Sequence, residues 1–188
     1  SLGMGLDKRI GSRFLRAGPA YGGSCFPKDT KAITATADLF KANLSIIKSV
    51  INSNSKRRKL LIRKIDKILS NKIKNKKITI LGVTFKPNTD DMRESTSLIM
   101  LPYLNKKGAK VTYYDPSGEK NEFKKLKNVL FSNNIKESCF KSDLIIIHTE
   151  WDEFKSIDFK KICKNKNLKI YDMRNLYSPK KMKSSGLI

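Results

Sequence analysis

The chain has 188 residues, of which 39% are hydrophobic, enough for one ordinary domain with a packed core, or one domain plus part of another. No apolar run approaches the roughly 20 residues of a membrane-spanning helix, and the first residues show no signal-peptide pattern. Three widely spaced cysteines and one histidine argue against a disulfide framework and against a metal site, so we expect a cytoplasmic protein without a metal. The formal charge of +23 is spread along the chain without a nucleic-acid recognition motif, which favours a solvated basic surface that attracts anions.

The first part of the chain, up to about residue 54, is expected to be mostly helical. Apolar residues at helical spacing lie between Ala32 and Phe40, and a second apolar face follows a polar break and runs to Leu69. The second face predicts a long helix over about 44–70, bent near 52–55, that joins two domains as a spine. It also carries the densest basic run of the chain, at 55–59.

From Lys77 onward, short apolar runs alternate with helical patterns. Strands are predicted at 78–83, 110–114, 129–131, 143–148 and 168–172, and helices at 95–107, 121–127, 135–141 and 159–164. This alternation implies a parallel sheet with helices on both faces, in which ligands bind at the carboxyl ends of the strands. The glycine-rich dinucleotide fingerprint is missing after the first strand, where Gly82 stands alone.

We therefore predict an α/β fold, a Rossmann-like parallel sheet with helices on both faces, preceded by a helical segment with a long spine helix. The predicted domains are 1–54, the end of a helical domain, and 55–188, the sheet domain.

The segment GGSCFPKD, Gly22 to Asp29, is the strongest candidate for a reactive site. Its glycines allow a sharp turn and a close approach of another group. Lys28 and Asp29 stay near Cys25 if a helix starts at Pro27, and a cation and a helix N-terminus both favour a thiolate. The segment is thus either a nucleophilic cysteine on a glycine-rich turn or a small buried cysteine at a loop-to-helix junction.

Three segments, in this order, resemble signatures of UDP-glucose 6-dehydrogenases, in the UDP-glucose/GDP-mannose dehydrogenase family. They are RIGSRFLRAGPAYGGSCFPKD from Arg9, FKPNTDDMRES from Phe85 and YDMRN from Tyr171. The resemblance covers essentially the whole chain. It implies the end of the family's central domain and a complete UDP-sugar-binding domain, without the N-terminal NAD-binding domain, so the chain alone is expected to be inactive.

The resemblance implies an NAD-dependent, two-step oxidation of UDP-glucose to UDP-glucuronate. Cys25 is the implied nucleophile, which forms a thiohemiacetal and then a thioester, and Asp29 helps to position or activate water. Lys28 and Arg93 are implied NAD contacts. The alternatives are a helix-start charge for Asp29, a surface lysine for Lys28, and an ion pair of Arg93 with Glu94 or Asp90.

The implied substrate contacts fall in all three signatures. They are Arg9, Phe14, Leu15, Arg16, Ala17, Gly18, Tyr21, Gly22, Phe85, Lys86 and Arg174. Among them, Arg9 resembles an arginine that reaches the site of a neighbouring subunit, and a homo-oligomer, at least a dimer, is expected to pair through the long helix.

Two alternatives stay open for the function. One is a non-catalytic sugar-nucleotide-binding module, and the other is a dehydrogenase for GDP-mannose or UDP-N-acetylmannosamine, although the Phe26-Pro27 pair favours UDP-glucose. Ala20 also departs from the family, which often has glycine there, and would cost on the order of 1 kcal/mol if the position needs a positive φ.

Overall fold

The computed structural model describes residues 1–12 and 14–184 of the chain. Within these residues the chain forms one five-stranded parallel sheet in the order β3-β2-β1-β4-β5. The strands are β1 (Lys77–Leu81), β2 (Lys110–Tyr114), β3 (Val129–Phe131), β4 (Leu144–Ile147) and β5 (Lys169–Asp172). β4 is buried along its whole length because helices cover both faces of the sheet, as its apolar run predicts. The Rossmann-like fold class is confirmed.

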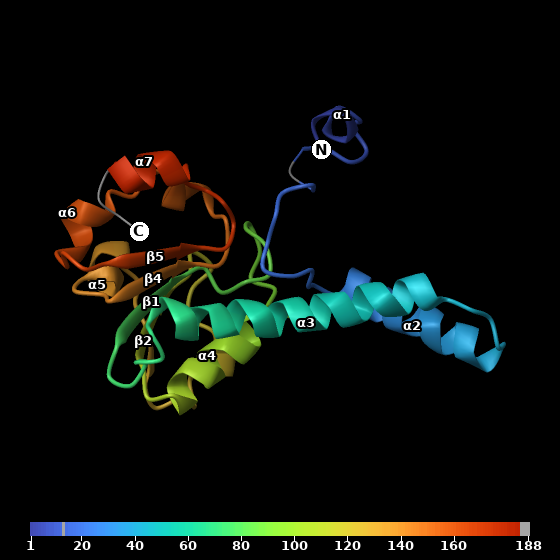
Figure 1. Cartoon of the computed structure of the whole chain (residues 1–188), viewed down its shortest axis with the longest axis horizontal. Coiled ribbons are helices and arrows are strands. Elements are labelled where there is room, and N and C mark those ends of the chain that lie inside the picture. The colour runs from blue at the N-terminus through green and yellow to red at the C-terminus, as the bar shows by residue number, and fades with distance from the viewer. Residues whose placement is uncertain (13, 185–188) are drawn as a thin grey trace.

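Two groups of helices cover the sheet (Figure 1). On one face, α4 (Ser97–Lys106) and the end of α3 (Ser45–Ile68) pack Met100 and Ile65 against the strands. On the other face, α5 (Ile135–Cys139) and α6 (Phe159–Cys163) bury Cys139 and Phe159. The remaining elements of this domain are η1 (Asn121–Phe123), η2 (Asp152–Ser156) and α7 (Pro179–Ser184).

The N-terminal part extends away from the sheet (Figure 1). After α1 (Leu2–Gly5), an irregular segment leads to α2 (Cys25–Leu39), which lies alongside the first half of α3. α3 then continues into the sheet domain as one 24-residue helix. It therefore connects the two parts of the chain without a flexible linker.

Most predicted elements are present, with four differences. The helix predicted at 121–127 is only the short 3-10 helix η1, the bend predicted near 52–55 does not interrupt α3, and the described residues of 6–12 and 14–24 are not helical. Glycines and proline break that last segment, whose Gly11 and Gly23 adopt positive φ. The elements η2 and α7, and the short α1 within the predicted helical region, had no specific prediction.

Among the described residues, no helix is both long and apolar enough to span a membrane.

Candidate functional site

Cys25 is the first residue of α2, two residues earlier than the predicted start at Pro27. Its side chain is exposed, so the prediction of a buried cysteine is wrong. Ser24 precedes it as the N-cap residue, with its hydroxyl oxygen 3.7 Å from the Cys25 sulfur and no cap hydrogen bond within the described chain. The thiol is thus presented at a helix N-terminus, a position that favours negative charge.

The two glycines before Cys25 bring the turn against the loop that follows β1. A Cβ on Gly22 would lie 2.8 Å from the carbonyl oxygen of Glu94, and Gly23, at φ +79, lies against the ring of Phe85. The amide of Gly23 donates a 2.8 Å hydrogen bond to the carbonyl of Arg93. The close approach that these glycines allow is therefore an approach of the cysteine turn to the sheet domain itself.

A cleft of about 960 Å³ lies between this turn and the carboxyl ends of β1, β4 and β5. Nine of the predicted residues line it: Phe14, Arg16, Gly18, Tyr21, Gly22, Cys25, Phe85, Lys86 and Arg174. Residues 16 and 18 come from the N-terminal loop, whereas 85 and 174 follow strands of the sheet. Residues that are far apart in sequence are thus combined into one basic, partly aromatic cleft.

Arg174 connects the strand ends beneath the cleft. Its Nε donates to the carbonyl of His148 at 2.9 Å, and its Nη2 donates to the carbonyl of Phe85 at 2.8 Å. Its Nη1 lies 2.9 Å from the carboxylate of Glu150, and both side chains are nearly buried. Burial lowers the pKa of Arg174, and Glu150 opposes that shift. A guanidinium has five N–H donors, so two of them can still face a ligand.

Aromatic rings form the outer wall of the cleft. The ring centroid of Phe26 lies 6.3 Å from that of Phe14 and 5.8 Å from that of Tyr21. Next to the first strand end, the ammonium of exposed Lys86 lies 5.2 Å from the ring centroid of Phe85. The cleft therefore offers apolar faces for a planar base or sugar and cations for phosphate.

A second cleft, of about 620 Å³, lies on the other side of the cysteine turn. It brings together Lys28 and Arg93, the two residues predicted to contact a dinucleotide, and Gly23 and Ser24 line both clefts. Arg93 does form an ion pair, with Asp91 at 2.8 Å rather than with Glu94 or Asp90. That hydrogen-bonded pairing lowers the pKa of Asp91 and leaves other guanidinium donors for an anion.

Four predicted residues line neither cleft. Leu15 and Ala17 lie in the N-terminal loop, and Asp29 is an exposed residue that pairs with Lys28 at 3.2 Å. Arg9 has a side chain that is 88% exposed and that forms a two-bond ion pair with Asp7. Ala20, the departure from the family pattern, has no positive φ, so its alanine carries no backbone strain.

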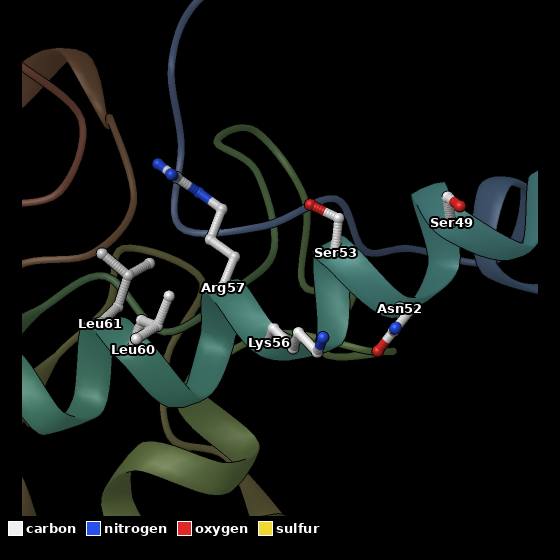
Figure 2. Close-up of a pocket in the computed structure, with 7 residues that line it drawn as sticks. All are labelled: Ser49, Asn52, Ser53, Lys56, Arg57, Leu60 and Leu61. Atoms are coloured by element: carbon white, nitrogen blue, oxygen red, sulfur yellow. The ribbon is translucent and has the colours of Figure 1, made fainter. Parts of the chain in front are cut away.

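Three residues that the sequence interpretation missed lie on one face of α3 and hold the N-terminal loop. Asn54 bonds both the amide and the carbonyl of Tyr21, at 3.0 and 3.1 Å. Arg57 donates twice to the carbonyl of Gly18, at 3.2 and 2.9 Å. Figure 2 shows the side chain of Arg57 extending from α3 toward that loop. Arg57 also lines a cavity of about 510 Å³ together with Ser53 and Leu61.

The third missed residue, Arg58, is 14% exposed and bonds Glu94 and the carbonyl of Tyr21. The basic run at 55–59 is therefore not only a solvated surface, because exposed Arg57 and partly buried Arg58 both bond to the N-terminal loop. Asn54, Arg57 and Arg58 are spaced i, i+3, i+4, which predicts that they share one face of a helix. The sequence does not show which loop this face contacts.

His148, the only histidine, directly follows β4, is bonded through its carbonyl to Arg174 and is buried. Burial lowers the pKa of His148 to about 3, and the Arg174 guanidinium shifts it the same way. Its Nδ1 lies 3.1 Å from the Thr149 hydroxyl. Among the described residues, no three histidine, cysteine or acidic side chains gather as a metal site would need.

Comparison with known proteins matches both parts of this architecture. The profile of the UDP-glucose/GDP-mannose dehydrogenase family, UDP binding domain, matches residues 79–179, and that of the family's central domain matches 1–56. UDP-glucose 6-dehydrogenases from Rhizobium meliloti and Rickettsia typhi are 40% and 41% identical over 98% and 99% of this chain. The chain spans 42% and 44% of the length of these two relatives.

A solved structure supports the same assignment. A UDP-glucose dehydrogenase from the hyperthermophilic archaeon Pyrobaculum islandicum matches 99% of this chain with a TM-score of 0.79 and 28% identity, over 40% of its own length. The profile of the UDP binding domain covers more than half of the chain, and the five-stranded parallel sheet agrees with it. The chain belongs to the UDP-glucose/GDP-mannose dehydrogenase family of nucleotide-sugar dehydrogenases.

Proposed function

We propose that this chain supplies the nucleophile and the nucleotide-sugar cleft of an NAD-dependent dehydrogenase that oxidises UDP-glucose to UDP-glucuronate in two steps. One observation carries the proposal: exposed Cys25 stands at the N-terminus of α2, on a turn whose Gly23 and Ser24 line two clefts. A nucleophile at such a boundary can meet a sugar from one side and a cofactor from the other.

The first cleft is suited to a nucleoside diphosphate sugar. Phe14 and Phe85 offer ring faces, while Arg16, Lys86 and the spare donors of Arg174 offer positive charge for phosphate oxygens. Lys28 and Arg93 would contribute to holding NAD in the second cleft. The turn after β1 carries no dinucleotide fingerprint, and its single Gly82 is packed so closely that a Cβ there would lie 2.5 Å from Thr149. NAD, when bound, supplies a hydride acceptor for both oxidations.

In the proposed chemistry, the Cys25 thiolate attacks the C6 aldehyde carbon, and the carbonyl oxygen takes up a proton to give a thiohemiacetal. Loss of a hydride from C6, together with the proton of the hydroxyl group on that carbon, leaves a thioester on the Cys25 sulfur. Water then attacks the thioester carbon, which releases the carboxylate and returns the thiol. Asp29, one helical turn after Cys25 on exposed α2, is proposed to orient that water.

The same chain is proposed to work as a homo-oligomer in the cytoplasm. Its three cysteines are free, as is usual in a reducing compartment. Large apolar side chains on α2 and α3 face solvent, among them Leu39 at 77%, Phe40 at 75% and Ile46 at 77% exposed. Several large apolar side chains exposed on two neighbouring helices and at the C-cap residue Phe40 are typical of an interface between subunits.

Calorimetric titration of this chain with UDP-glucose, UDP and GDP-mannose tests the cleft assignment. Binding of both UDP ligands with weaker binding of GDP-mannose is expected, and binding of the GDP sugar alone would overturn the substrate assignment. In the whole enzyme, Cys25→Ser should abolish NADH formation while UDP-glucose still binds. Binding without any dependence of turnover on Cys25 would favour a non-catalytic module.

A further inference from the structure

The loop after β1 holds an acidic residue, Glu94, in an unusual position. Its backbone adopts φ +55, in the left-handed region that a side chain with a Cβ disfavours. Such strained residues persist only where the surrounding structure holds them, and they gather at functional sites. Its carbonyl oxygen faces Gly22, at a point where any Cβ on that glycine would come within 2.8 Å.

Both helices of the N-terminal part reach Glu94. Arg58 of α3 donates to its carboxylate at 2.7 Å and to its carbonyl at 2.7 Å. Lys31 of α2 donates to the other carboxylate oxygen at 3.0 Å. The side-chain hydrogen bonds from Arg58 and then Lys31 lower the pKa of Glu94, so the carboxylate is charged at neutral pH.

Arg58 also reaches the cysteine turn directly. Its Nη2, which binds the Glu94 carbonyl, donates to the carbonyl of Tyr21 at 2.9 Å as well. On the other side of Glu94, the Arg93 carbonyl accepts the Gly23 amide. The turn from 21 to 25 is thus held at its start by Arg58 and at its middle by the backbone beside Glu94.

From these contacts we infer that Arg58 and Glu94 are positioning residues, a pair that holds the Gly22–Cys25 turn so that Cys25 stands at the boundary of the two clefts. Neither residue lines the nucleotide-sugar cleft, although both border the second cleft. In the chain without a cofactor, their contact with the cysteine turn is therefore the route by which they act on Cys25. The inference rests on the proposed function only in taking Cys25 as the nucleophile.

The test measures the rate at which iodoacetamide alkylates Cys25 in the 188-residue chain at pH 8. Cys139 and Cys163 are buried, and burial raises the pKa of both thiols, so Cys25 is the thiol that reacts; Cys25→Ser sets the background. The variants are Arg58→Met, Arg58→Lys and Glu94→Gln. The matched control is Lys59→Met, because Lys59 is the exposed next residue on the same helix.

We expect Arg58→Met and Glu94→Gln to slow alkylation about fivefold, because the thiolate loses its fixed place at the helix N-terminus. Arg58→Lys keeps the positive charge but loses the planar fork of donors, so its alkylation rate should lie between those of the unmodified chain and of Arg58→Met. UDP affinity should change less than twofold in all variants, which separates positioning of Cys25 from general loss of structure. Thermal unfolding of each variant shows that it folds.

Alkylation rates within twofold of the unmodified chain for the folded variants would overturn the inference. Slower alkylation accompanied by an equal loss of UDP affinity would overturn it too, because the pair would then stabilise the whole cleft and not the cysteine turn in particular. The proposed function fails in a different way, namely if UDP-glucose does not bind, or if Cys25→Ser leaves turnover of the whole enzyme intact.

Discussion

Gly18 and Arg174 lie in such close contact that a Cβ on residue 18 would come within 2.4 Å of Nη1 of the arginine. The same guanidinium holds the carbonyls of His148 and Phe85. A glycine in the N-terminal loop therefore permits the loop to close over the strand ends, and the cleft takes its shape from that contact.

The first prediction concerns Gly18→Ala. The added methyl must displace either the loop or the guanidinium, so UDP affinity should fall about tenfold, equal to about 1.4 kcal/mol, in calorimetric titration. Gly3→Ala is the matched control, because a Cβ there meets nothing within 4 Å. An unchanged dissociation constant for Gly18→Ala would show that the contact does not shape the binding site.

The second prediction concerns the nearly buried ion pair between Arg174 and Glu150. Arg174→Met should reduce the free energy of unfolding by about 3 kcal/mol in urea, because Glu150 is left as an unpaired, nearly buried charge. The double variant with Glu150→Gln should lose less than the sum of the two single losses.

The matched control for that pair is Arg63→Met, at an exposed arginine on α3, which should shift stability by less than about 0.5 kcal/mol. Strict additivity of Arg174→Met and Glu150→Gln would mean that the two side chains are not energetically coupled.

The third prediction uses the single histidine of the chain. Burial lowers the folded-state pKa of His148 to about 3, from an ordinary value of 6.5. A depressed folded pKa means that its contribution to stability is complete above pH 6.5 and is lost as the pH falls toward 3. In that window the unfolded chain binds one proton more, so stability should fall by about 1.4 kcal/mol per pH unit.

Urea unfolding at several pH values between 4 and 7 measures this slope. His148→Gln should reduce the slope of stability against pH by the contribution of one proton. The carboxylates contribute to the slope mainly nearer pH 4, and they do so in both proteins. An identical slope with and without the imidazole would mean that His148 protonates in the folded chain.

The fourth prediction addresses the exposed apolar face of α2 and α3. Ile46→Glu should shift the chain to a smaller species in size-exclusion chromatography with light scattering, because the charge would be buried between subunits. Leu130→Glu is the control, because Leu130 is 65% exposed on the edge strand β3, away from those helices. Equal masses for the unmodified chain and both variants would mean that the subunits contact each other through another surface, or that the chain does not associate.

The sheet could be predicted closely from the sequence because its signals are local. The runs 110–114 and 129–131 are strands with the predicted bounds, since short β-branched and aromatic runs need no distant information. The segment 121–127 is different, because it was predicted to be a helix and only Asn121–Phe123 forms a short 3-10 helix. The buried ring of Phe123 packs on Tyr113. A tertiary contact decided its conformation.

The candidate site was predictable where a motif marks it, as for Cys25, Phe85 and Arg174. It was not predictable where a contact joins distant segments. Arg58 and Glu94 are 36 residues apart, and a charged side chain in a basic helix gives no indication of which acid it meets. The positive φ of Glu94 is likewise a product of that contact rather than of its sequence neighbours.

α3 runs unbroken for 24 residues, about 36 Å, from the far end of the N-terminal part to the sheet. The cysteine turn is bonded to the middle of this helix through Arg58, and the last turns of the helix pack Ile65 into the core of the sheet that carries Arg174. One continuous helix therefore supports both the turn that carries Cys25 and the sheet whose strand ends are followed by Lys86 and Arg174. The spacing between the thiol and these two cations depends on a helix and not on a flexible linker between the two parts of the chain.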